Sequence, residues 1–229
     1  MSQPGHAPRE YQIAELTRGA ELPQPALQSR HLTIIAEFLV RAWQELLKAQ
    51  EQVMRTKEEP EVNALMESRL LGFLEEGREW ATLVKIVCRG KESHNYDGRS
   101  LEKRPDLSIY LTDKDARFPL IVECKLIDKT AQKEVTLYGN DGLARFLNGD
   151  YAWYAQEAFM LAYVRDGSTI GDCLIPYLAA RQNRAPDPFL TEQLPQTVTL
   201  PSQDLARSRH GRGFPNNPGP IAIWHLWLS

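Results

Sequence analysis

The stretch IVECKLID, residues 121–128, constrains the fold of this chain more than any other stretch. Its apolar residues form a run typical of a buried strand, yet Glu123 and Lys125 stand in the middle of it. Charged side chains are rarely buried unless they are paired or bind a metal ion. Because side chains alternate between the two faces of a strand, Glu123 and Lys125 point to the same face. The stretch therefore predicts either an ion pair within a strand or the centre of a functional site.

Length and charge limit the classes of protein to consider. A chain of 229 residues can hold one α/β domain with an extension, or at most two small domains. The formal net charge of −3 argues against a broadly basic nucleic-acid-binding protein, but it is compatible with an enzyme that keeps its basic residues in local patches. The three cysteines show no C-x-x-C spacing, so neither a disulfide framework nor a zinc site is indicated.

The sequence also predicts where the protein works. No apolar run approaches the roughly 20 residues that a membrane-spanning helix needs. The first residues, MSQPGHAPREYQIAEL, lack the basic and then apolar order of a secretory signal. We therefore expect a cytoplasmic protein without a membrane partner.

The N-terminal part is predicted to be an arm followed by helices. Residues 1–28 hold several prolines and glutamines without periodicity, which predicts a flexible or loosely docked arm. Apolar residues at helical spacing predict an amphipathic helix over 31–55, so 29–57 is interpreted as a helical extension. Its apolar stripe either binds a protein partner or a second copy of the chain, or packs on the chain's own core. A second helix, 58–77, has Pro60 and three glutamates at its start.

The remainder, 58–229, is predicted to be one mixed α/β domain. Alternation of apolar residues and turn signals predict the following order: strands at 81–89, 105–113 and 119–128, a helix from Thr130 that carries Gln132 and Lys133, a strand at 158–164, a helix at 169–182, a Pro- and Gly-rich loop at 186–220 and a strand at 221–228.

Two of these strands bring carboxylates together. If the strands pair through the turn at 113–117, Asp106 and Glu123 approach one another at one end of the sheet. Two carboxylates and the backbone carbonyl of Cys124 are suitable oxygen ligands for a hard cation such as Mg²⁺. Lys125 could orient or deprotonate an attacking water, or neutralise charge on a phosphate. These groups are the ones that hydrolysis of a phosphodiester needs.

The segment RPDLSIYL…LIVECKL resembles the PD-(D/E)XK nuclease superfamily, which has the restriction-endonuclease-like fold. The resemblance covers roughly residues 58–165. It implies Asp106 and Glu123 as metal ligands and Lys125 as the catalytic lysine. Many members of the superfamily add an acidic residue from the helix before the first strand, and here Glu61 or Glu67 is available, with Glu61 preferred.

The resemblance further implies a nuclease that uses Mg²⁺ or Mn²⁺ to cut DNA, in a restriction or anti-phage defence setting and together with a protein partner or as a homodimer. Polar residues that could bind nucleic acid occur around the site and in the basic window 206–214, although a solvated surface is an equal or better interpretation for most of them. They are Lys129, Gln132, Lys133, Arg145, Arg209 and Arg212.

Other interpretations remain open. Glu123 and Lys125 are alternatively neighbours on an exposed edge strand, where an ion pair contributes little to stability. Asp106 is alternatively a turn residue, and Glu61 a favourable charge at a helix start. The protein is alternatively a catalytically inactive nuclease-fold subunit that acts as a scaffold or binds nucleic acid, or an α/β domain unrelated to nucleases.

Overall fold

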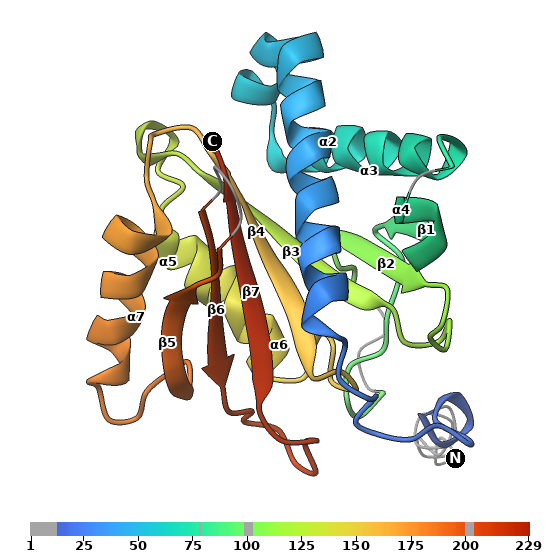
Figure 1. Cartoon of the computed structure of the whole chain (residues 1–229). Helices are drawn as coiled ribbons and strands as arrows, with labels where there is room; N and C mark the ends of the chain where they lie inside the picture. Colours follow the sequence, from blue (N-terminus) through green and yellow to red (C-terminus); the bar gives the residue numbers. More distant parts are fainter. Residues whose placement is uncertain (1–12, 78, 99–102, 200–203) are drawn as a thin grey trace, which may run out of the picture.

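The computed structural model of this chain describes residues 13–77, 79–98, 103–199 and 204–229. Within these ranges it is an α/β protein, with N-terminal helices followed by a seven-stranded mixed open sheet and interspersed helices (Figure 1). None of the helices in these ranges is both long enough and apolar enough to cross a membrane.

The order of elements follows the predicted order in most places. The helices are α2 (Ser29–Thr56), α3 (Glu59–Glu75), α4 (Glu79–Leu83), α5 (Val135–Leu137), α6 (Ala144–Leu147) and α7 (Ile175–Gln182), with a 3₁₀ turn η1 (Lys129–Ala131) and π-helical segments η2 (Tyr138–Leu143) and η3 (Ile170–Leu174). The strands are β1 (Val84–Arg89), β2 (Leu107–Leu111), β3 (Leu120–Ile127), β4 (Glu157–Val164), β5 (Thr191–Thr197), β6 (Asp204–His210) and β7 (Ile221–Leu228).

The strands lie in the order β1-β2-β3-β4-β7-β6-β5. β1, β2 and β3 are successively antiparallel, whereas β3, β4 and β7 are parallel to one another. The last strand in the chain, β7, therefore lies inside the sheet, and β6 and β5 continue from it in antiparallel pairs. β1 and β5 are the edges, so β3 has a neighbour on both sides. This position rules out the interpretation of Glu123 and Lys125 as neighbours on an edge strand.

Two hydrophobic clusters cover the two faces of the sheet. On one face, α2, α3 and α4 pack against apolar residues of β2, β3, β4 and β7. On the other face, η2, α6, η3 and α7 pack on the alternate residues of β3, β4 and β7. The apolar stripe of α2 is part of the first cluster, since Leu32, Ile35 and Leu39 are at most 2% exposed. The chain's own core thus covers the stripe that was one candidate for a partner interface.

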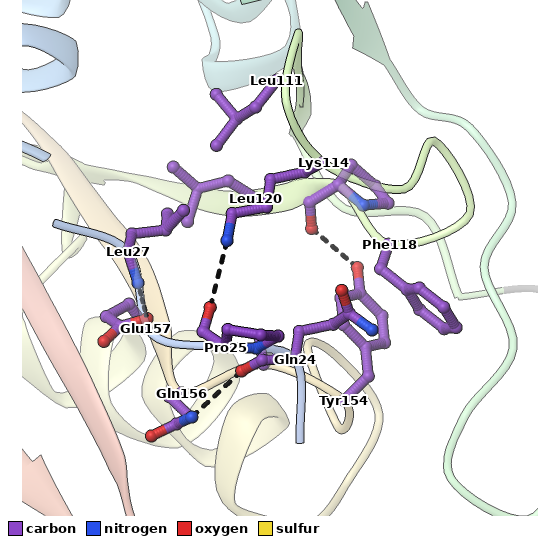
Figure 2. Close-up of a pocket in the computed structure, with 12 residues that line it drawn as sticks. Gln24, Pro25, Leu27, Leu111, Lys114, Phe118, Leu120, Tyr154, Gln156 and Glu157 are labelled. Atoms are coloured by element: carbon purple, nitrogen blue, oxygen red, sulfur yellow. Dashed lines mark hydrogen bonds between the residues drawn. The ribbon is translucent and has the colours of Figure 1, made fainter. Parts of the chain in front are cut away.

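Residues 13–28 of the predicted arm are docked on the domain, and residues 1–12 lie outside the described residues. The backbone N–H of Gln24 donates to the carbonyl of Tyr154 at 2.8 Å. The backbone N–H of Leu27 donates to the carboxylate of Glu157 at 3.2 Å. Figure 2 shows this segment forming one wall of a small pocket beside Tyr154. These contacts show where residues 13–28 lie on the domain. The flexibility of the arm remains a prediction.

Three predicted elements differ from the structure. Residues 81–83, predicted as strand, belong to the helix α4. The helix expected from Thr130 is only the turn η1, because Gln132 adopts a left-handed conformation (φ 57°) that ends it. The loop predicted over 186–220 contains β5 and β6, so the window with Arg209 is not a flexible loop.

Candidate functional site

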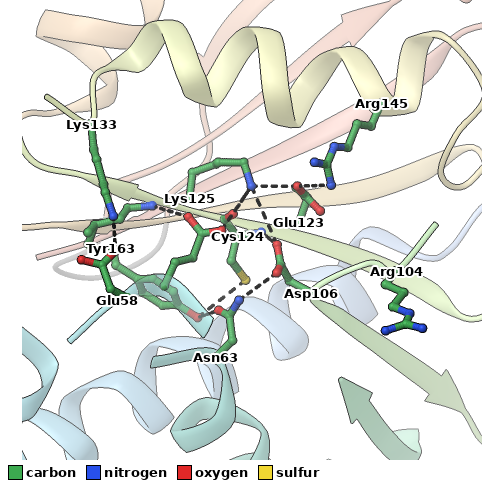
Figure 3. Close-up of polar contacts among 12 residues, drawn as sticks. Glu58, Asn63, Arg104, Asp106, Glu123, Cys124, Lys125, Lys133, Arg145 and Tyr163 are labelled. Atoms are coloured by element: carbon green, nitrogen blue, oxygen red, sulfur yellow. Dashed lines mark hydrogen bonds and ion pairs between the residues drawn. The ribbon is translucent and has the colours of Figure 1, made fainter. Parts of the chain in front are cut away.

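The pairing of β2 with β3 brings the predicted acidic residues together. Leu107 pairs with Val122, which places Asp106, just before β2, beside Glu123 on β3. Glu123 and Lys125 share the face of Ile121 and Ile127, which η2 and α6 cover, and Asp106 lies at the start of β2 within 4.0 Å of Lys125. Figure 3 shows their side chains converging, as the sequence predicted.

The ammonium group of Lys125 lies at the centre of this cluster. Its Nζ is 2.8 Å from Glu123 Oε1 and 2.7 Å from the backbone oxygen of Cys124. It also lies 3.3 Å from Glu59 Oε1 and 4.0 Å from Asp106 Oδ2. Burial by itself lowers the pKa of Lys125, but the three surrounding carboxylates outweigh burial and raise it above its ordinary value. Lys125 therefore stays protonated, and its ammonium group is held in place by the surrounding carboxylate and carbonyl oxygens.

A close contact with η2 holds the stem of Lys125 in place. A Cβ atom added at Gly142 would lie 2.5 Å from Met160 Cε and 3.5 Å from Lys125 Cε. A larger residue would require the end of the Met160 side chain to move. Gly142 thus lets this helical segment cover the aliphatic part of the lysine.

Asp106 is oriented by two donors that sequence reasoning did not identify as part of the site. Asn63 Nδ2 donates to Asp106 Oδ1 and the backbone N–H of Cys124 donates to Asp106 Oδ2, both at 2.8 Å. Asn63 is 1% exposed, and its side-chain oxygen accepts a hydrogen bond from the Tyr163 hydroxyl at 2.7 Å. The Tyr163 ring stacks on Trp43 of α2, with ring centroids 5.2 Å apart. These contacts connect the N-terminal helix to Asp106.

The acidic residue that α3 contributes is Glu59, and the prediction of Glu61 is wrong as to position. Glu59 Oε2 accepts the backbone N–H of Leu126 at 2.9 Å, and its other oxygen faces Lys125. Glu61 instead lies on the surface, where it accepts from the backbone N–H of Glu58 in a capping box and pairs with Lys57 at 2.9 Å. The hydrogen bond from Lys57 lowers the pKa of Glu61.

The alternative acid on the same helix, Glu67, also lies away from the cluster, since it accepts the backbone N–H of Arg89 at 2.7 Å. Helical spacing was the signal that could have identified Glu59. Val62, Asn63 and Met66 follow it by three, four and seven residues and are all buried. Glu59 therefore lies on the face of α3 that packs on the sheet.

Glu123 is the most buried member of the cluster, with a side chain that is 1% exposed. Arg145 of α6 lies 3.1 Å from its Oε1 and also donates to the Tyr151 hydroxyl at 2.8 Å. The other carboxylate oxygen of Glu123, Oε2, is buried without a hydrogen-bond partner. Burial, and secondarily the charge of Asp106, raises the pKa of Glu123 to about 8. A buried carboxylate oxygen without a partner is a position where a cation or water is needed.

The oxygen atoms of the cluster fit a hard divalent cation. No three of the His, Cys, Asp and Glu side chains within the described ranges are arranged to hold a metal ion as they stand. A site here would instead combine the carboxylates of Asp106 and Glu123 with the carbonyl of Cys124. Carboxylate and carbonyl oxygens are the ligands that Mg²⁺ takes, with water completing the set. The unpartnered Oε2 of Glu123 agrees with this donor set.

The six residues predicted to bind nucleic acid lie in different places. Arg145 belongs to the cluster. Lys129 and Gln132 are exposed in and after η1, and Lys133 pairs with Glu58 at the start of α3 (Figure 3). These residues border the cluster on its α3 side.

The two arginines of the basic window are remote from the cluster and have protein partners. Arg209 lies on β6 and pairs with Glu192 at 2.8 Å. Arg212 is 8% exposed and donates to the carbonyls of Ala152, Trp153 and Ala155. Burial lowers the pKa of Arg212 to about 10, and its two terminal nitrogens already donate to backbone carbonyls, so this buried arginine holds a loop in place and does not form a surface for nucleic acid.

Comparisons with known proteins return no match: no family model, no curated protein and no solved structure is similar to this chain. The geometry of the cluster is therefore the basis for assigning a function.

Proposed function

We propose that this protein is a nuclease that hydrolyses DNA phosphodiester bonds with Mg²⁺ or Mn²⁺. The observation that carries the proposal is the convergence of Asp106, Glu123 and Lys125 from two adjoining strands on one partly open face. The side chains of Asp106 and Glu59 are each 23% exposed, and that of Arg145 is 39% exposed. Solvent, and hence a substrate phosphate, has access to this side of the cluster.

The chemistry follows from the charges and donors. When bound by Asp106, Glu123 and the Cys124 carbonyl, the divalent cation supplies Lewis-acid polarisation of the phosphodiester and of water. Lys125, whose Nζ lies 2.8 Å from Glu123 Oε1 and 4.0 Å from Asp106 Oδ2, is placed to donate to the attacking water or to the phosphate. Arg145 is placed to neutralise negative charge that develops on the phosphate.

The resemblance to the PD-(D/E)XK superfamily supports the same proposal. That pattern requires an acid at the start of one strand and an acid and a lysine two residues apart on the next strand, and here the strands are β2 and β3. We therefore propose that α3, β1, β2, β3, the η2–α6 segment and β4 form a restriction-endonuclease-like core. A role in restriction or anti-phage defence, alongside a protein partner or a second copy, is part of this proposal.

The test is a cleavage assay with substitutions in the cluster. Plasmid and linear DNA are incubated with the protein and Mg²⁺, Mn²⁺ or EDTA, and products are separated on gels. We expect cutting only with a divalent cation, and a fall in rate of at least about a hundredfold for Asp106→Ala and Lys125→Ala. Calorimetric titration with Mn²⁺ in the absence of DNA should show binding to the wild type but not to Asp106→Ala.

Matched controls come from exposed positions nearby. Asp113→Ala removes an acid from the turn after β2, and Lys85→Ala removes a lysine from β1; both side chains are exposed. We expect wild-type cutting from both. Cutting that survives both Asp106→Ala and Lys125→Ala would show that the site is assigned wrongly.

A second candidate function is a non-catalytic subunit of the same fold that binds nucleic acid or acts as a scaffold. One observation favours it: Lys125 already bonds to Glu123, Glu59 and the Cys124 carbonyl, so these oxygen atoms have a cationic partner without a metal. This candidate predicts that the wild type binds DNA, does not cut it with either cation, and does not bind Mn²⁺.

A further inference from the structure

A pocket of about 320 Å³ lies beside the cluster on the same face of the sheet. Its floor is Ser108 and Tyr110 of β2 and Ile121 of β3. Ser108 follows Asp106 by two residues, and Ile121 precedes Glu123 by two residues. Residues two positions apart on a strand are about 6.7 Å apart and have side chains on the same face of the sheet. The pocket therefore begins about this distance from the carboxylates of Asp106 and Glu123.

The walls of the pocket carry aromatic side chains, two basic residues and the acidic Glu92, which pairs with Arg104 at 2.6 Å. Trp153 and Tyr154 form one wall, and the segment 91–94 and the turn residues Ala116 and Arg117 form the others. The hydrogen-bonding groups of the two aromatic residues are already used by the protein. Trp153 Nε1 donates to the His94 carbonyl and Tyr154 donates to the Pro119 carbonyl, both at 2.8 Å. The rings are thereby held in fixed orientations, and the 7% of each residue that is exposed is the part that a flat ligand would contact.

Among the described residues at the rim, one cation is available to a ligand and one is not. The ammonium group of the exposed Lys91 lies 4.8 Å from the centroid of the Tyr110 ring, and both residues line the pocket. Arg117, in contrast, pairs with Asp115 at 2.5 Å and donates to the carbonyls of Leu16 and Arg18. Lys91 is thus the rim group that can pair with an anion.

We propose that this pocket binds the base and sugar of the nucleotide next to the cleaved phosphate, with Lys91 contacting the following phosphate. The inference rests on the proposed function, because the occupant is taken to belong to the strand that is cut. The volume lies at the lower end of the range for small-molecule sites, about 300–1,000 Å³. Aromatic walls bind nucleobases by stacking, which requires no particular sequence.

The experiment fills the pocket from its exposed side. Ala116→Trp places a large side chain in the pocket from an exposed turn, and Lys91→Ala removes the rim charge. Ala180→Trp on the exposed surface of α7 and Lys85→Ala on β1 are the matched controls. Binding of the single-stranded trinucleotide pTpTpT in EDTA is followed by saturation-transfer NMR on its base protons, and cutting of single-stranded DNA is followed with Mg²⁺.

We expect Ala116→Trp to weaken trinucleotide binding and raise KM for cutting by at least about tenfold each, because stacking is lost. Lys91→Ala should weaken binding a few fold, with a smaller effect in high salt. Neither control should change binding or KM. If Ala116→Trp binds and cuts like the wild type, the pocket assignment is wrong while the nuclease remains.

The two proposals fail in different ways. A wild type that never cuts, but transfers saturation to the base protons and loses this transfer in Ala116→Trp, overturns the nuclease and supports the pocket. A wild type that cuts but transfers no saturation to the bases overturns the pocket alone.

Discussion

Glu59 and Glu61 are two residues apart at the start of α3, yet their surroundings differ completely. Glu59 is largely buried between Lys125 and the backbone of Leu126, and burial raises the pKa of its carboxyl. Glu61 is on the surface and caps its own helix. A difference of two residues is about 200° around a helix, so one side chain faces the sheet and the other faces solvent.

This contrast gives a matched pair of substitutions. Glu59→Gln should lower kcat/KM for DNA cutting by about 10- to 100-fold, which is typical when a residue that orients the catalytic groups is changed. Glu61→Gln should leave cutting unchanged and alter stability by less than about 0.5 kcal/mol, because glutamine can still complete the capping box. Steady-state cleavage assays and urea unfolding measure the two effects. Equal losses of activity in both variants would contradict the assignment of Glu59.

The pair formed by Asn63 and Tyr163 makes a second prediction about single residues. Tyr163→Phe keeps the stacking on Trp43 but removes the hydroxyl that orients Asn63, and through it Asp106. We expect kcat to fall about tenfold and the Mg²⁺ concentration for half-maximal activity to rise, with a loss of stability of about 1–2 kcal/mol.

The control is Tyr138→Phe, which removes a hydroxyl from a tyrosine that is equally buried and does not contact Asp106. It should lower stability by a similar amount without changing the Mg²⁺ dependence. If both variants lose activity in proportion to stability, Tyr163 has only a structural role.

At the scale of elements, apolar periodicity predicted α2, α3, β2, β3, β4 and β7. It failed for β6, and the reason is physical. The side chains of β6 that face the core include Ser208 and His210, which are at most 1% exposed. These residues are buried because they hydrogen-bond to residues that are distant in sequence, and no local pattern reveals such partners. The prediction of a strand at 81–83 failed for a different reason, because a few apolar residues fit a helix and a strand equally well.

The buried polar residues of β6 and β7 form a directed chain of hydrogen bonds. His210 Nδ1 lies 2.8 Å from the Phe189 carbonyl and must donate to it, so its Nε2 accepts from Ser208, 2.7 Å away. Ser208 then accepts from His225 Nε2 at 2.7 Å, and the hydroxyl of Tyr138, which lies 2.9 Å from His225 Nδ1, also donates to the Met160 carbonyl at 3.1 Å. Each ring nitrogen is used once, and both histidines are neutral.

This chain predicts loss of stability in acid. Burial lowers the pKa of His210 to about 4, against an ordinary value near 6.5, and also lowers the pKa of His225. Between these values the unfolded chain binds the proton more strongly, so the free energy of unfolding falls as the pH falls from 6.5 towards 4. The loss attributable to His210 amounts to about 3 kcal/mol.

His210→Asn tests this prediction, because asparagine still donates to the Phe189 carbonyl but does not titrate. Urea unfolding at several pH values should give a shallower slope for the variant by about 1.4 kcal/mol per pH unit between pH 4 and 6.5. His31→Asn at the start of α2 should keep the wild-type slope. Parallel slopes for all three proteins would show that His210 already carries its proton when folded.

At the scale of the whole molecule, the sheet consists of two parts that meet at β7. β1 to β4 carry the candidate site, and β6, together with β7, carries the buried polar chain. β7 pairs with β4 on one side and with β6 on the other, and all eight of its residues are buried. Its alternate side chains contribute to both hydrophobic clusters.

The place of β7 matters while the protein is being made. Synthesis proceeds from the amino end, so β4 is made before its partner β7. Some sixty further residues are synthesised before β7 is available, and until then one side of β4 is unpaired. A nascent chain in that condition offers open N–H and C=O groups to any extended peptide it meets. A chain that ends before β7 is therefore expected to aggregate more readily than the complete sheet.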